Sequence, residues 1–181
     1  MTGIEFVRKM AAKGANLNVR MTKKVSIGMT GVNTLGATPF FMAARSADAE
    51  LMRVLAELGA DSKINNADNS TPLMAAAGLG ARSPGEDAGT EAEVLEAIQV
   101  ALDHGNDINA VDNNGETAMH GAAYKNSPDA VELLAAKGAK REVWDKANKN
   151  GWTPLRIAEG YRFGNFNPSL VTIDAFHRMP R

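Results

Sequence analysis

The chain has 181 residues and a formal net charge of −1, with 44% hydrophobic and 23% charged residues. These values are ordinary for a folded protein with a sizeable core, and they argue against a disordered chain. A near-neutral chain also lacks the excess of basic residues that neutralises nucleic-acid phosphates. No cysteine is present, which excludes disulfides, thiolate metal sites and a cysteine nucleophile.

No apolar run approaches the roughly 20 residues of a membrane-spanning helix. The N-terminal stretch MTGIEFVRKMAAKG carries its charges within the apolar segment, whereas a secretory signal peptide carries them before it. We therefore expect neither a membrane nor a nucleic-acid partner. The compartment stays open: the chain is cytoplasmic as written, or periplasmic or secreted if a leader has been removed.

The first predicted helix, IEFVRKMAAKG, runs from Ile4 to Gly14, a glycine suited to the left-handed conformation after a last turn. It corresponds only to the second helix of the repeating unit described below, so its apolar residues lack a first helix to pack on. This end of the chain indicates a truncated protein, a docked partner or self-association through residues 4–10.

A phrase of threonine, usually proline, and then apolar residues ending in alanine occurs four times, at Thr38, Thr71, Thr117 and Thr153. Proline at a first helical position starts a helix readily, because it lacks only an N–H group that would be unpaired there. Each phrase therefore predicts a short helix. Paired alanines within three of these phrases allow neighbouring helices to approach closely.

A second helix is predicted after each of these phrases, with apolar residues at helical spacing. Its starts are marked by a capping box at Thr90–Glu93 and by Ser127-Pro128 and Asn167-Pro168. Its ends are marked by glycines that suit positive φ, and Asn69 takes a turn position where the other units have glycine. These glycines are Gly14, Gly59, Gly105 and Gly138.

The spacing of these signals defines a repeating unit. Thr38 to Gly59 is 21 residues and Gly59 to Thr71 is 12, which together give a unit of 33 residues. This period and the TPLH-type phrase resemble the ankyrin repeat. The resemblance implies an all-α solenoid of helix-turn-helix units joined by β-hairpin-like finger loops. The phrases GATPFFMAA, PGEDAGT and GWTPL also resemble those of bacterial ankyrin-repeat proteins that are exported or longer at the N-terminus.

The repeat divides the chain into one ankyrin domain of five parts. The first is an incomplete repeat and the last a capping repeat, and the parts span residues 1–19, 20–64, 65–111, 112–147 and 148–181. The second part carries an insertion of about a dozen residues in its finger. The third carries thirteen extra residues between its helices, expected at the opposite edge of the fold. The sequence does not decide whether loops 20–35 and 79–90 serve function or are tolerated variation.

Residue patterns that would indicate catalysis or metal binding are weak. The three histidines lie far apart in the sequence, without metal-ligand spacing. The stretch Asp107–Glu116 fails as a calcium loop because Val111 occupies a ligand position. No phosphate-binding loop or hydrolase nucleophile elbow is present. We therefore predict no enzyme activity, no cofactor and no metal. The resemblance implies that His120 bonds to Thr117 and to loop backbone.

The resemblance also implies that finger tips and the inner-helix face bind a partner protein. Trp, Tyr and Arg most often dominate the energy of such interfaces. Tyr124, Trp152, Arg156 and Tyr161 fall in consecutive layers and are expected to form one cluster, unless Trp152 packs over the last finger or Tyr161 belongs to the C-terminal cap. The predicted partner-binding residues are Leu35, Arg45, Asp68, Ser70, Asn114, Glu116, Tyr124, Asn150, Trp152, Arg156 and Tyr161.

The sequence thus predicts a non-catalytic protein–protein interaction module for an unidentified partner. One alternative is an accessory or regulatory subunit permanently associated with an enzyme, or self-associating through the incomplete N-terminal repeat. A second is an enzyme that uses the inserted loops, which requires a deep pocket where MTKKVSIGMTG meets the inner helices. A third is a spacer within a longer chain, marked by a surface without an aromatic cluster.

Overall fold

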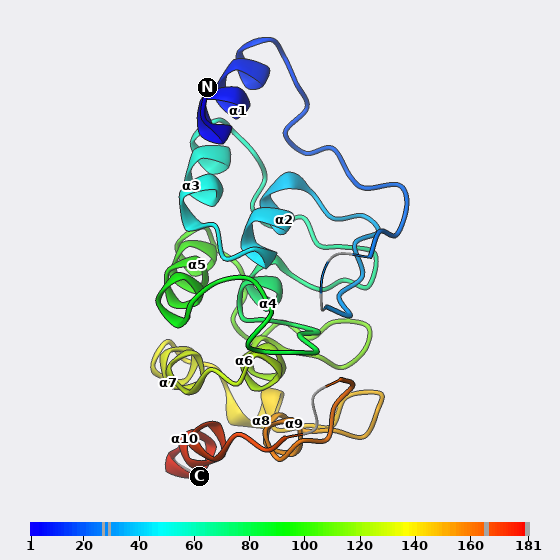
Figure 1. Cartoon of the computed structure of the whole chain (residues 1–181), viewed down its shortest axis with the longest axis vertical. Helices are drawn as coiled ribbons and strands as arrows, with labels where there is room; N and C mark the ends of the chain where they lie inside the picture. The colour runs from blue at the N-terminus through cyan, green and yellow to red at the C-terminus, as the bar shows by residue number, and fades with distance from the viewer. Residues whose placement is uncertain (27, 29, 165–166, 180–181) are drawn as a thin grey trace.

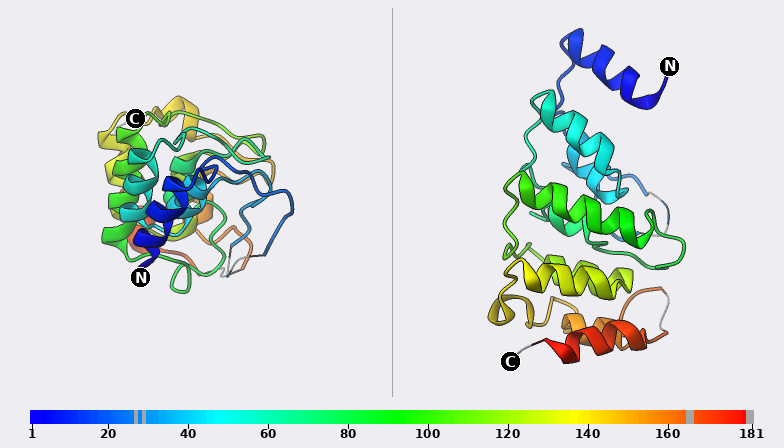
Figure 2. Two further views of the ribbon diagram at one scale, coloured as in Figure 1. Left: turned by 90° about the horizontal axis from the view of Figure 1, so that it is seen from above. Right: turned by 90° about the vertical axis from the view of Figure 1, so that its left-hand side faces the viewer.

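A computed structural model describes residues 1–26, 28, 30–164 and 167–179 as two stacked columns of helices with loops along one side (Figure 1). The inner column holds α2 (Pro39–Arg45), α4 (Pro72–Ala76), α6 (Ala118–Lys125) and α9 (Pro154–Ala158). The outer column holds α1 (Gly3–Ala12), α3 (Ala49–Glu57), α5 (Glu91–Asp103), α7 (Pro128–Ala136) and α10 (Leu170–Arg178), which lie one above another in Figure 2. A short helix, α8 (Arg141–Trp144), lies in the last finger, between α7 and α9.

Each inner helix contacts the next inner helix, and each outer helix contacts the next outer helix. The two ends of the chain lie at opposite ends of the stack (Figure 1). Within the described ranges there are only helices and one isolated antiparallel bridge, so the predicted all-α architecture is confirmed. None of the helices in those ranges is long and apolar enough to cross a membrane.

The four threonine phrases start the four inner helices, as predicted. Thr38, Thr71, Thr117 and Thr153 are the N-cap residues, and each hydroxyl accepts the N–H three residues later. Proline is the first helical residue of α2, α4 and α9. The cap satisfies an N–H group that has no partner inside the helix, which is why threonine here fixes where each helix begins.

The outer helices confirm most of the predicted boundaries. Thr90 forms the capping box of α5, and Ser127 caps α7 with Pro128 at its first turn. The glycines at the helix ends have positive φ between 79° and 99°, and Asn69 has φ 61°. The predicted start of α10 at Asn167 is wrong by two residues, because the cap is Ser169. The Ser169 amide donates to the Ala158 carbonyl at 2.9 Å, which holds this residue against α9 and delays the helix.

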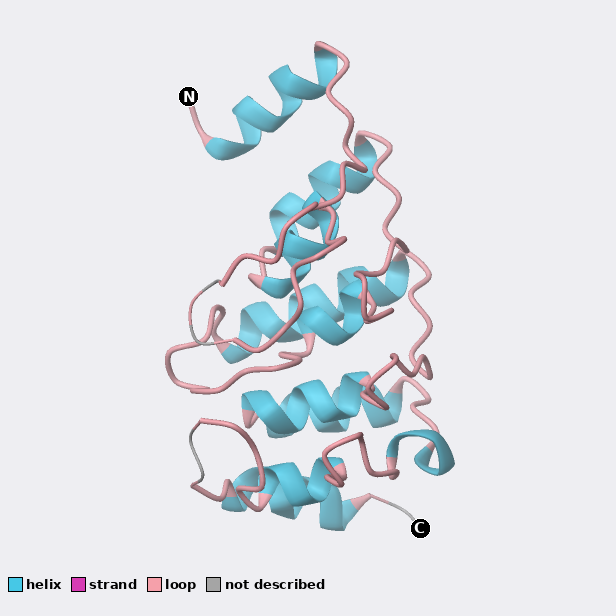
Figure 3. Cartoon of the chain, turned by 90° about the vertical axis from the view of Figure 1, so that its right-hand side faces the viewer, coloured by secondary structure: helices cyan, strands magenta, loops and turns pink. Residues whose placement is uncertain are grey.

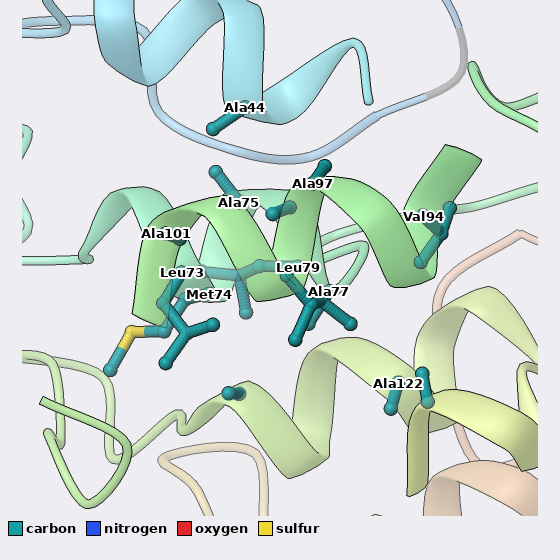
Figure 4. Close-up of a cluster of buried hydrophobic side chains, with 14 of the residues drawn as sticks. Ala44, Leu73, Met74, Ala75, Ala77, Leu79, Val94, Ala97, Ala101 and Ala122 are labelled. Atoms are coloured by element: carbon teal, nitrogen blue, oxygen red, sulfur yellow. The ribbon is translucent and has the colours of Figure 1, made fainter. Parts of the chain in front are cut away.

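Small side chains fill the space between the layers. Ala44 of α2, Ala75 of α4 and Ala122 of α6 are buried between neighbouring layers, together with larger residues such as Leu73 and Met74 (Figure 4). Gly121 marks a close approach of α6 to α4, since a methyl group there would lie 3.0 Å from the Met74 carbonyl oxygen. Because no layer covers its own apolar face, each one is stable only against its neighbours.

The sequence did not predict α8, which lies in the lengthened last finger. Its Trp144 is buried and packs against Phe176 of α10, with ring centroids 5.7 Å apart. A helix of four residues is too short to leave a periodic pattern in the sequence. The extra residues of this finger therefore bring a large side chain under the last outer helix.

The two insertions meet each other, although the sequence placed them at opposite edges. Thr30 and Ala81 form the isolated bridge, and the Gly31 amide donates to the Gly80 carbonyl at 2.7 Å. The second insertion leaves the end of α4 and passes along the loop side of the stack, seen face-on in Figure 3. Contact between them depends on residues far apart in the sequence, which spacing alone does not show.

A buried ion cluster holds the far end of the second insertion. The Asp87 carboxylate pairs with Arg45 of α2, and Lys125 of α6 lies 3.5 Å from its other oxygen. All three side chains are less than 10% exposed. The Lys125 ammonium also donates to the carbonyls of Asp87 and Ala88, at 3.0 and 2.7 Å. Burial lowers the pKa of Lys125, and the charge of Asp87 opposes this effect.

We expect Asp87→Asn to lower the free energy of unfolding by about 3 kcal/mol, because it leaves two buried cations without their counter-charge. Glu86→Gln is the matched control, since Glu86 is an exposed carboxyl in the same loop. Urea unfolding followed by circular dichroism measures both variants. Equal stability of the two variants would show that the cluster does not anchor the insertion.

Candidate functional site

A hollow of about 370 Å³ lies on the loop side of the stack, against the inner column. The fingers are the four loops that precede α2, α4, α6 and α9. All four contribute to the wall of the hollow, and α6 contributes Tyr124. Residues 31–33 and 79–82 of the two insertions complete the wall, together with Phe163 from the loop after α9. Six of the predicted partner-binding residues line it: Asp68, Ser70, Asn114, Glu116, Tyr124 and Asn150.

Backbone hydrogen bonds join each finger to the next. The amides of Ala67, Asn113 and Lys149 donate to the carbonyls of Leu35, Asp68 and Asn114, at 2.8 to 2.9 Å. The predicted residues Leu35, Asp68 and Asn114 thus mark the positions where successive fingers touch. These bonds align the four fingers into one continuous surface beside the inner helices.

Each of the last three fingers is also held by one side chain at its base. The side-chain oxygens of Asn66, Asp112 and Asn148 each accept the backbone N–H groups two and four residues later. This geometry is the side-chain turn that Asx residues favour. The Ser70 hydroxyl then donates to the other Asp112 oxygen at 2.7 Å, linking the second finger to the third.

Glu116 occupies the same repeat position as Ser70 and links the third finger to the fourth. Its Oε1 accepts from Asn148 Nδ2 at 2.9 Å and from the Tyr124 hydroxyl at 3.1 Å. Its Oε2 is buried and has no hydrogen-bond partner among the described residues. Burial raises the pKa of Glu116 to about 7, and the hydrogen bonds from Tyr124 and Asn148 limit the rise.

Tyr124 is 5% exposed, so it forms part of the floor of the hollow rather than a projecting contact. Burial and the neighbouring Glu116 carboxylate raise the pKa of its hydroxyl above the usual value. The hydroxyl therefore stays protonated and serves as a hydrogen-bond donor to Glu116. Asn148 Nδ2 also donates to this hydroxyl, at 3.2 Å, which closes a three-residue network.

The predicted cluster of four aromatic and arginine residues divides into separate groups. Arg156 lies over the Tyr161 ring at 3.8 Å and pairs with Glu159 at 3.1 Å. Trp152 packs edge-on against Phe163, with centroids 5.0 Å apart, and Tyr124 lies in the buried network. Phe163 links Trp152 to the hollow, because it contacts Trp152 and also lines the hollow.

Two further predicted residues lie away from the hollow. Leu35 is 38% exposed at the tip of the first finger. Arg45 does not project toward solvent, because its guanidinium is buried against Asp87.

Residues that the sequence analysis did not select also shape the site. Arg82 and Lys149 are exposed cations of the lining, and Phe163 is an exposed aromatic residue. Arg162 is buried, and its guanidinium donates to the Tyr124 carbonyl at 2.7 Å, which ties the last loop to the end of α6. These residues lie outside the repeated phrases or at variable positions in them, so no periodic signal identified them.

His120 behaves as a structural residue of α6. Its Nδ1 accepts from the Thr117 amide at 3.2 Å, which confirms the predicted bond to Thr117. Burial lowers the pKa of His120 to about 4, and the nearby backbone of Trp152 and Lys146 opposes the shift. In the part of the chain that the structure describes, no three His, Cys, Asp or Glu side chains are grouped to hold a metal ion.

Comparison with known proteins agrees with this architecture. Residues 88–167 match the family described as ankyrin repeats (3 copies). The human neurogenic locus notch homolog protein 1 is 31% identical over 144 residues, which cover 68% of this chain. The chain belongs to the ankyrin-repeat family. Ankyrin repeats are generally protein–protein interaction modules and are typically non-catalytic.

Other relatives show the same limited span. The Xenopus tropicalis notch homolog 1 is also 31% identical over 144 residues, and the human notch homolog 2 is 36% identical over 85 residues, or 47% of this chain. The ankyrin-repeat chain spans 6% of the notch homolog 1 proteins and 3% of human notch homolog 2. These relatives are animal proteins, so the bacterial source expected from the sequence stays a prediction.

We expect Glu116→Gln to increase the free energy of unfolding at pH 8 and to leave it nearly unchanged at pH 4.5. The folded-state pKa is raised to about 7, so the stability of the wild type is highest below the unfolded pKa of 4.5 and falls as pH rises through 7. The shift corresponds to a difference on the order of 3 kcal/mol. Denaturant titrations of both proteins from pH 4.5 to 8 measure it. Parallel pH profiles would contradict the raised pKa.

Proposed function

We propose that the finger loops and the inner-helix face bind a partner protein, with the hollow at the centre of the contact. The main support is that six residues selected from repeat positions line a single hollow. The fingers around it are held in register by backbone bonds, so the surface is organised before a partner arrives. A preorganised surface loses less conformational entropy on binding than flexible loops do.

The predicted residues divide into two roles within this proposal. Asn150, Arg156 and Tyr161 are exposed and Trp152 is partly exposed, so these side chains supply direct contacts beside the hollow. Ser70, Glu116 and Tyr124 are buried and set the shape and polarity of its floor. Arg45 contributes by anchoring the second insertion through Asp87. The five-part division of the chain at residues 19, 64, 111 and 147 is part of the same proposal.

The enzyme alternative required a deep pocket where MTKKVSIGMTG meets the inner helices, and Gly31 is the one residue of that stretch in the described lining of the hollow. Its chemistry favours binding over catalysis. The Ser70 hydroxyl donates to Asp112, and that carboxylate already accepts two backbone amides. A serine nucleophile needs an adjacent base that can take its proton, and the described lining includes no histidine. We therefore propose a non-catalytic module.

We expect Arg156→Glu to weaken capture of a protein partner from extract of the source organism by at least about tenfold, as loss of an interface arginine typically does. Arg178→Glu is the matched control, since both arginines are about half exposed and each pairs with one glutamate. Arg178 lies on the outer column, away from the fingers. Quantitative capture with each immobilised variant measures the effect. Equal loss with both variants, or with neither, would place the interface elsewhere.

The alternative of self-association, or permanent attachment to an enzyme, is supported by α1. This helix buries no residue fully, and Phe6 and Met10 are 50% and 42% exposed. A stacked repeat normally covers such apolar side chains with the next layer. The same face is where a second copy or an enzyme partner would dock under this alternative.

This alternative predicts a concentration-dependent mass above 19.2 kDa in size-exclusion chromatography with light scattering. Phe6→Glu should then return the chain to a monomer, because it places a charge in the apolar contact. Lys9→Glu on the same helix controls for the change in charge. A monomer at all concentrations would remove self-association and weaken the alternative of permanent attachment to an enzyme.

A further inference from the structure

We propose that the hollow is a binding site for an organic cation, a guanidinium or primary ammonium group held by the carboxylates of Glu116 and Asp68. Two observations point to this class of ligand. The carboxylates of Glu116 and Asp68 line the hollow without a cationic partner among the described residues, and Glu116 Oε2 has no hydrogen-bond partner among them. The inference does not depend on the proposed protein partner, because a small molecule could fill the same site.

The unpartnered acceptor is Glu116 Oε2. The residue is only 7% exposed and lines the hollow, while its other oxygen is occupied by Tyr124 and Asn148. A buried polar atom without a partner destabilises the folded state, so native structures rarely leave one unmatched. A ligand donor that reached this oxygen would satisfy it, and a positive charge bound beside Glu116 would compensate the burial of the carboxylate.

Asp68 supplies the second acceptor. Its Oδ1 accepts from the side-chain amide of Asn33 at 3.0 Å, and its Oδ2 has only a long contact of 3.5 Å with the side-chain amide of Asn114. The described residues place no cation in an ion pair with it. The third carboxylate of the lining, Asp112, differs because Ser70 and two backbone amides occupy its oxygens. Two carboxylates therefore remain for a ligand.

The cations of the lining do not reverse this preference. Arg82 and Lys149 are exposed, so water and salt screen their charges. Glu116 is buried, where charge interactions are screened much less. An anionic ligand would gain weak attraction at the rim and meet the carboxylates inside. A cationic ligand gains the stronger interaction.

The lining also has an apolar and aromatic part, which suits the alkyl chain of a ligand and the flat face of its guanidinium group. Val32 and Leu79 are buried apolar residues of the lining, and Tyr124 and Phe163 add aromatic rings. Aromatic faces attract cations, guanidinium more often than ammonium. A guanidinium also presents several N–H donors in one plane, which suits two separate acceptors better than a single ammonium point charge.

The test is an NMR titration of the full chain with n-butylguanidinium, using n-butylurea as a neutral ligand of nearly the same shape. At pH 8 we expect the cation to bind at least about tenfold more tightly, the preference worth one charge-assisted contact. Glu116→Gln should reduce the preference to about twofold or less. Glu142→Gln, which neutralises an exposed carboxyl of α8, should leave it unchanged.

Lowering the pH from 8 to 6 should weaken cation binding to the wild type by about tenfold, because Glu116 then becomes largely protonated. Tyr124, Asp112, Asp68, Arg82 and Lys149 are the other titratable or charged residues of the described lining. Glu116→Gln should remove the pH dependence. This comparison separates a specific role of Glu116 from general attraction to the surface.

The source of the cation is tested with N-acetyl-L-arginine amide, which carries the same group on a peptide backbone. Tighter binding than n-butylguanidinium would assign the site to an arginine of a partner protein, and weaker binding would assign it to a free small molecule. Equal binding of the cation and n-butylurea, or retention of the preference in Glu116→Gln, would overturn the inference. So would the absence of binding by every probe. Circular dichroism of each variant confirms that it is folded.

Discussion

The structure depends on the close contact between successive inner helices. Gly121 of α6 lies against the Met74 carbonyl of α4, and buried alanines line the same interface. Side chains this small allow the helix backbones to approach, so that each layer covers the apolar face of its neighbour. The regular spacing of the layers in turn sets the spacing of the fingers. Without that spacing, the backbone bonds between successive fingers could not form in series.

The two insertions convert the side of this stack into a hollow. A plain stack of fingers and inner helices leaves an open surface along its length. Here the first finger is joined to the second insertion by the Thr30–Ala81 bridge, while Asp87 holds the insertion to α2 and α6. Burial removes water from two cations and one carboxylate, and their mutual attraction offsets this desolvation penalty only when all three are present. The cluster therefore favours one position of the loop over many alternatives.

The sequence predicted the features that depend on neighbouring residues. Thr38 and its three equivalents fix the helix starts because capping uses an N–H group three residues away, and the terminal glycines fix the ends through φ alone. The start of α10 was missed because a bond from Ser169 to α9 overrides the local signal. The meeting of the insertions and the burial of Arg45 depend on residues 42 or more positions apart, which spacing could not show.

The candidate site also has some residues that the sequence predicted and others that depend on distant contacts. Repeat position alone was enough to select Asp68, Asn114 and Asn150, which line the hollow, because equivalent positions in stacked units lie side by side. Repeat position did not show that Tyr124 would be buried, since its hydroxyl is used by the Glu116 carboxylate. It also missed Phe163, which comes from the C-terminal loop and has no equivalent in the other units.

The position of Glu116 explains how the fold accommodates an unfavourable residue. Ser70, its equivalent one unit earlier, makes the same link to the next finger with a neutral hydroxyl. The Glu116 carboxylate adds a second oxygen that has no partner among the described residues, and burial raises the pKa of Glu116 to about 7. The link between two fingers therefore does not require a carboxylate. The layers on both sides of α6 hold the backbone in place whichever residue links the fingers. The stack therefore tolerates the unfavourable burial of the Glu116 carboxylate. Local departures of this kind are typical of binding sites, where the missing partner is supplied by the ligand.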